Sequence, residues 1–145
     1  MTTTRIALSP ETVRSDLAVW RVNLMRAGYL FMAVGLITVK WPLLGQAASL
    51  PLFEGVTLTL LTAMSLLALL GLARPVKLLP VLLFETTWKV LWLGLVALPH
   101  AFAGDLSTAM TEVLVNCSLV VVIIAVTPWN YVWRTYARAR MEAWR

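Results

Sequence analysis

Four long stretches of this chain are almost wholly apolar, and short segments that hold most of the charge separate them. A helix needs about 20 mostly apolar residues to cross the hydrocarbon core of a bilayer. The pattern therefore predicts an all-α fold, an integral membrane four-helix bundle. We see no repeat, linker or low-complexity segment, and so expect a single transmembrane domain over 1–145. The predicted spans are residues 24–44, 56–73, 78–98 and 111–133.

The composition supports lipid as the solvent of this fold. Apolar residues make up 60% of the chain and charged residues 13%, whereas soluble domains carry about 25% charged residues. A soluble domain of this size keeps much of its surface in water, so it could not hide so much apolar area.

The cationic residues are distributed unevenly between the two sides of the predicted bundle. Ten of the twelve lysines and arginines lie before the first span, between the second and third spans, or in the C-terminal tail. Positively charged loops stay in the cytoplasm, which predicts that both termini are cytoplasmic. This rule already explains the basic tail, so we expect no nucleic-acid partner. The first residues lack the apolar region of a secretory signal, and we expect the helices to stay in the mature protein.

Features at the span ends refine this layout. Ser9, Pro10 and Glu11 form a helix-start signal, which predicts a short amphipathic N-terminal helix. Pro128 is expected to bend the end of the fourth span. Aromatic side chains are expected to anchor the helices at the membrane interfaces; they are Trp20, Trp41, Trp129, Tyr131 and Trp133.

Small residues should mark the contacts between helices, because lipid provides no hydrophobic drive for helix association. Each of the first three spans carries a candidate pair, and these are Gly28 with Gly35, Ala68 with Gly71, and Gly94 with Ala97. The single cysteine, Cys117, has no partner for an intramolecular disulfide. We expect it to be a small packing residue.

The third span carries two charges, Glu85 and Lys89. Each charge at the centre of a membrane helix costs about 3 kcal/mol on insertion scales. Residues four apart share a helix face, so the two side chains can pair. Trp88 and Trp92 fall on the same face. We therefore expect this face to point into the bundle or a cavity, and not to lipid.

Asn116 is the only amide well inside a predicted span. Its side-chain oxygen can accept a hydrogen bond from the Lys89 ammonium only if the third and fourth spans are favourably staggered. Intramembrane polar residues are functional candidates by default. The predicted ligand-binding residues are therefore Glu85, Lys89, Trp88, Trp92 and Asn116. The alternative is that the ion pair only fixes the register and orientation of its helix.

Several kinds of chemistry are not indicated. With one histidine and one cysteine, His100 and Cys117, the chain cannot form a His-ligated haem pair or a zinc site by itself. It has no glycine-rich phosphate loop, CxxC or GxSxG motif. We therefore expect no metal and no cofactor, and we assign no catalytic residue.

Residues 25–134 resemble a group of small bacterial four-span membrane proteins, and in size and layout they are similar to DoxX-like membrane proteins. The most specific part is the pattern LPxLLxExxWKxxW at residues 79–92. The resemblance implies a four-helix bundle in the bacterial cytoplasmic (inner) membrane. It implies no activity.

Three functions remain open at this point. The first, which the lack of catalytic motifs favours, is a non-enzymatic module that binds a lipid-like or small apolar molecule or serves as an accessory subunit. The second is a small proton-coupled transporter that uses Glu85, although Lys89 would neutralise that carboxylate. The third is a membrane-embedded isomerase or cyclase with Glu85 as acid or base. Membrane lipids, a second copy of the chain or a larger membrane complex are the expected partners.

Overall fold

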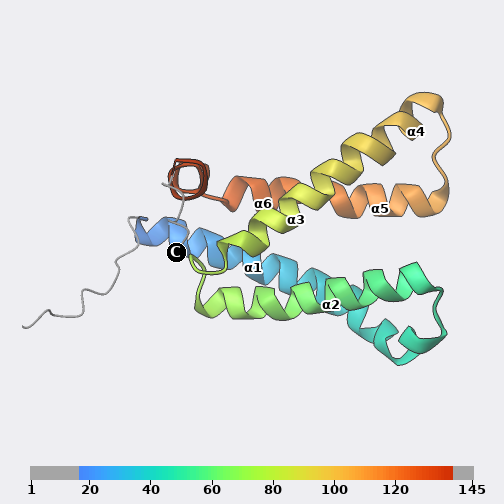
Figure 1. Cartoon of the computed structure of the whole chain (residues 1–145), viewed down its shortest axis with the longest axis horizontal. Helices are drawn as coiled ribbons and strands as arrows, with labels where there is room; N and C mark the ends of the chain where they lie inside the picture. The colour runs from blue at the N-terminus through green and yellow to red at the C-terminus, as the bar shows by residue number, and fades with distance from the viewer. Residues whose placement is uncertain (1–16, 139–145) are drawn as a thin grey trace, which may run out of the picture.

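The computed structural model describes residues 17–138, and this range is helical without any strand (Figure 1). Four of its helices are long and apolar enough to cross a membrane, as the sequence predicts. They cover Val19–Ser49, Leu52–Ala73, Leu79–Ala103 and Thr108–Val126. The predicted amphipathic helix at Ser9–Glu11 lies outside the described residues.

Some of these spans are built from more than one helical segment. The first joins α1 (Val19–Lys40) to a 3₁₀ segment η1 (Trp41–Ser49), and α2 (Leu52–Ala73) is continuous. The third runs through α3 (Leu79–Trp92), a π-helical segment η2 (Leu93–Ala97) and α4 (Leu98–Ala103). The fourth consists of α5 (Thr108–Ser118) and α6 (Val120–Val126), and α7 (Trp129–Val132) and a π-helical segment η3 (Trp133–Ala137) follow it.

The helices form two hairpins that meet at one end and diverge toward the other (Figure 1). The first hairpin is α1–η1–α2, and the second runs from α3 to α6. Between the hairpins, α1 packs against α6 and α2 packs against α3. Helix α5 instead packs within its own hairpin, against α3 and η2. The bundle is therefore closed where α2 turns into α3.

The two ends of the bundle differ in the charge of their residues. The end where the hairpins meet carries six cationic residues of the described chain. They are Arg21 and Arg26 on α1, Arg74 and Lys77 between α2 and α3, Arg134 on η3, and Arg138 directly after it. We call this end the basic end. The opposite end carries Lys40, Glu54, His100, Asp105 and Glu112.

Polar contacts of α1 hold the basic end together. The buried Tyr29 hydroxyl donates to the Pro75 carbonyl at 2.9 Å, and the Arg26 Nε donates to the Leu72 carbonyl at 3.2 Å. The Tyr29 ring lies directly against Gly71, so that a Cβ on Gly71 would overlap three ring atoms. The carbonyls of Leu72 and Pro75 lie where α2 ends, and backbone carbonyls there lack a helical N–H partner. Side chains of α1 provide the missing donors.

The predicted small-residue contacts are confirmed in part. Gly28 lies against Val126 of α6, and Ala68 and Ala97 are buried. Gly35 and Gly94 would each have open space around an added Cβ, so the prediction that they pack is wrong. Gly35 lies about two turns from Gly28 on α1 and is exposed.

Span four ends earlier than the predicted residue 133, and Pro128 breaks the helix where a bend was expected. Thr127 has an extended backbone (ψ 128°), the conformation favoured before proline. Pro128 has no N–H to donate to the Ile124 carbonyl. The indole Nε1 of Trp129 donates to that carbonyl instead, at 2.8 Å. Helix α7 then starts a new direction at the basic end.

Candidate functional site

The charged cluster of α3 is positioned by the buried face of that helix. Leu79 and Leu82 are fully buried, and Glu85 continues their line at 1% exposure. Helix α3 packs against both α5 and α6. The prediction that the Glu85–Lys89 face looks into the bundle is confirmed, since Trp88 and Trp92 are half-buried while Thr87 on the opposite side is exposed.

Both oxygens of the Glu85 carboxylate have a partner on α3 itself. The Lys89 ammonium lies 2.6 Å from Oε1, and the Trp88 indole Nε1 donates to Oε2 at 2.8 Å. The Lys89 side chain is 14% exposed, and its ammonium lies 5.6 Å from the centre of the Trp88 ring. The lysine therefore forms an ion pair and a cation–π contact. The carboxylate forms two charge-assisted contacts, one with each oxygen.

The other predicted site residues do not join this cluster by hydrogen bonds. Asn116 is exposed, and its amide makes no hydrogen bond with Lys89 or any other residue of 17–138. Its neighbour Cys117 takes the inward position on α5 and is buried, so Asn116 points away from the bundle interior. Successive residues of a helix point about 100° apart. Trp92 shares the half-buried face of α3 but donates no hydrogen bond within the described range.

Thr86 is a polar group that the sequence did not single out. Its hydroxyl is buried and has no hydrogen-bond partner in the described part of the chain. A helical threonine usually donates to the carbonyl four residues earlier, as Thr87 does to Leu83 at 2.7 Å. Next to Glu85, α3 thus carries one buried polar atom without a hydrogen-bond partner among residues 17–138.

An apolar pocket of about 310 Å³ lies between the hairpins, and we call it the interhairpin pocket. It is formed by one face of α2 and the first turns of α3, and it does not include Glu85. Its lining residues are Leu60, Ala63, Met64, Leu67, Pro80, Val81 and Phe84. None of them carries a polar side chain, so the pocket suits an apolar group only.

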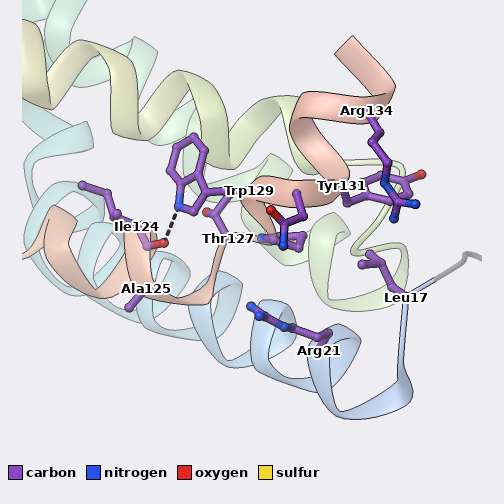
Figure 2. Close-up of a pocket in the computed structure, with 10 residues that line it drawn as sticks. Leu17, Arg21, Ile124, Ala125, Thr127, Trp129, Tyr131 and Arg134 are labelled. Carbon is purple, nitrogen blue, oxygen red and sulfur yellow. Dashed lines mark hydrogen bonds between the residues drawn. The ribbon is translucent and has the colours of Figure 1, made fainter. Parts of the chain in front are cut away.

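A larger pocket of about 490 Å³ lies at the basic end (Figure 2), and we call it the basic-end pocket. It forms where α6 stops at Val126 and α7 turns away beside the start of α1. Its lining residues are Leu17, Arg21, Ile124, Ala125, Thr127, Pro128, Trp129, Asn130, Tyr131 and Arg134. The sequence pattern did not predict this pocket, although Pro128 followed by aromatic and basic residues indicates a change of chain direction.

Comparisons with known proteins do not extend this description. No protein-family model, curated protein or solved structure matches the chain. The resemblance to small four-span bacterial proteins therefore stays a prediction. No group of three histidine, cysteine, aspartate or glutamate side chains that could hold a metal ion occurs between residues 17 and 138.

Proposed function

We propose that this chain is a multi-pass protein of the bacterial inner membrane that acts as a non-enzymatic module and binds a lipid-like or small apolar molecule. Four apolar helices of membrane-spanning length support the membrane assignment. The basic end would face the cytoplasm, because six cationic residues of the described chain gather there. Both termini would then be cytoplasmic.

The observation that carries the binding proposal is the interhairpin pocket. Its volume of about 310 Å³ lies at the lower end of the range for ligand pockets, about 300–1,000 Å³. Its walls are wholly apolar, and they come from α2 and α3, which belong to different hairpins. A narrow apolar group such as an acyl chain could enter from the side of the bundle and lie between α2 and α3.

The state of Glu85 supports a non-enzymatic function over the two alternatives. A proton-coupled transporter or an acid–base enzyme needs a carboxylate that exchanges a proton with substrate or water. Glu85 is 1% exposed, both of its oxygens are engaged, and neither described pocket includes it. Its neutralising partner is built into the same helix.

Native mass spectrometry of the protein purified in mild detergent tests the binding proposal. We expect the wild-type protein to carry a small apolar molecule. Ala63→Phe places a ring in the interhairpin pocket and should abolish or strongly reduce this adduct. Ala27→Phe is the matched control, because Ala27 is exposed on α1 and lines neither pocket. An adduct that survives Ala63→Phe unchanged, or no adduct in the wild type, would contradict the proposal.

A further inference from the structure

The basic-end pocket is lined by two arginines, Arg21 and Arg134. Neither Arg21 nor Arg134 forms an ion pair or donates a side-chain hydrogen bond within residues 17–138. Arg26, one turn further along α1, shows the contrast. It donates to the Leu72 carbonyl at 3.2 Å and to the Asn23 side-chain oxygen at 3.0 Å.

The two guanidinium groups reach the pocket from different elements. Arg21 projects from the first turns of α1 and Arg134 from η3, on two sides of the pocket (Figure 2). The Arg21 guanidinium carbon lies 4.6 Å from the centre of the Trp20 ring, which supports the side chain near the surface. No acidic residue is among those that line the pocket.

The other polar side chains of the pocket differ in whether they already form hydrogen bonds within the described chain. The Thr127 hydroxyl donates to the Ile123 carbonyl at 2.7 Å, and the Trp129 indole donates to the Ile124 carbonyl at 2.8 Å (Figure 2). The Asn130 side chain is exposed and has no hydrogen-bond partner in the described range. Among residues 17–138, no hydrogen bond or ion pair occupies the side chains of Arg21, Arg134 and Asn130.

The other side of the pocket is apolar. Ile124 and Ala125 belong to the last turn of a membrane-spanning helix, and Leu17 precedes α1. The pocket thus places apolar walls beside two cations at the end of the spans. This combination suits an amphiphile with an anionic head and an apolar body.

We infer that the basic-end pocket binds the phosphate headgroup of an anionic phospholipid. Arginine pairs with phosphate oxygens through two parallel N–H donors, and both Arg21 and Arg134 line this pocket. The start of the lipid tail would lie against Ile124 and Ala125. This site is separate from the interhairpin pocket, so the two proposals succeed or fail independently.

Native mass spectrometry with added lipid tests the inference on the full chain. Phosphatidylglycerol is the anionic probe, phosphatidylcholine the probe without net charge, and inorganic phosphate the soluble source of the same group. We expect the wild-type protein to retain phosphatidylglycerol in preference to phosphatidylcholine. Inorganic phosphate should compete poorly because it lacks a tail.

Two double variants separate the pocket from general surface charge. Arg21→Gln with Arg134→Gln removes both pocket cations, and Arg74→Gln with Lys77→Gln removes two exposed cations outside the pocket at the same end. Loss of two charge-assisted contacts should weaken phosphatidylglycerol binding by at least about tenfold more in the pocket variant than in the loop variant.

A third variant tests the pocket without changing charge. Ala125→Phe fills the apolar side and should weaken phosphatidylglycerol binding, which remains informative if the double arginine variant does not fold. Equal losses in the two double variants, no effect of Ala125→Phe, or no preference for phosphatidylglycerol over phosphatidylcholine would overturn the inference. Binding of inorganic phosphate as strong as that of the lipid would also overturn it, since the site would then belong to a soluble anion.

Discussion

Glu85 and Lys89 form their ion pair within one helix, so the pair links no two helices. The 2.6 Å contact brings opposite charges together on α3, and the Trp88 indole satisfies the second carboxylate oxygen. The pair lowers the cost of placing α3 in the membrane. It cannot by itself set the register between α3 and its neighbours.

Glu85→Gln should destabilise the protein because it leaves the largely buried Lys89 charge without its partner. Loss of one member of a buried pair costs about 3 kcal/mol or more. The double variant Glu85→Gln with Lys89→Met should recover much of this loss. Reversible unfolding in detergent micelles measures the free energies of both variants.

The exposed Glu54 of α2 provides the control for this cycle. Glu54→Gln should change the free energy of unfolding by less than about 0.5 kcal/mol, as surface substitutions usually do. If the double variant is no more stable than Glu85→Gln alone, the ion-pair account of α3 is wrong.

Trp88→Phe should remove one hydrogen bond to the buried carboxylate and keep most of the ring packing. A hydrogen bond to a charged group contributes about 1.5–3 kcal/mol, and we expect a loss of stability in this range. Trp133→Phe is the control, because Trp133 is 60% exposed and donates no hydrogen bond in the described range. The same unfolding measurement applies, and equal effects of the two substitutions would refute the role of the indole N–H.

Gly71→Ala and Gly35→Ala should change stability in opposite directions. The added methyl group at residue 71 would overlap the Tyr29 ring, and overpacking of this kind costs about 1–3 kcal/mol. Residue 35 has open space, so the higher helix propensity of alanine should stabilise α1 by up to about 1 kcal/mol. Thermal unfolding in detergent compares the two variants. A stabilising Gly71→Ala would mean that α1 and α2 pack less closely than described.

Membrane orientation can be tested with single cysteines. The native Cys117 is buried and should not react with a membrane-impermeant maleimide, so the unaltered protein serves as the background. In intact cells, Asp105→Cys should be labelled from the outside, and Lys77→Cys should be labelled only after the cells are opened. Labelling of Lys77→Cys in intact cells would place the basic end outside and reverse the proposed topology.

The sequence predicted the spans well because membrane helices leave a strong signal in composition alone. It also predicted the buried face of α3. Glu85, Trp88 and Lys89 are spaced three and four residues apart, which places them on one face of a helix. Where a helix ends was harder. Residues 127–133 look apolar enough to continue span four, and the missing N–H of Pro128 decides that α6 stops at Val126.

Contacts between helices could not be predicted from residue type. Gly28 and Gly35 look equivalent on one face of α1, yet only Gly28 has a close neighbour, Val126 of α6. Asn116 looked like the partner of Lys89, but the rotation of α5 turns Cys117 inward in its place. Both outcomes depend on the angles between helices, which packing over the whole bundle sets.

The most direct test of the central claim, that an apolar molecule lies between the hairpins, is photocrosslinking with a diazirine-labelled fatty acid in native membranes. Mass spectrometry of the digested protein would locate the modified residues. We expect crosslinks concentrated on the residues of the interhairpin pocket, with Leu60, Leu67 and Phe84 prominent, and lost in Ala63→Phe. Crosslinks spread evenly over all lipid-facing helices, and unchanged by Ala63→Phe, would contradict the account.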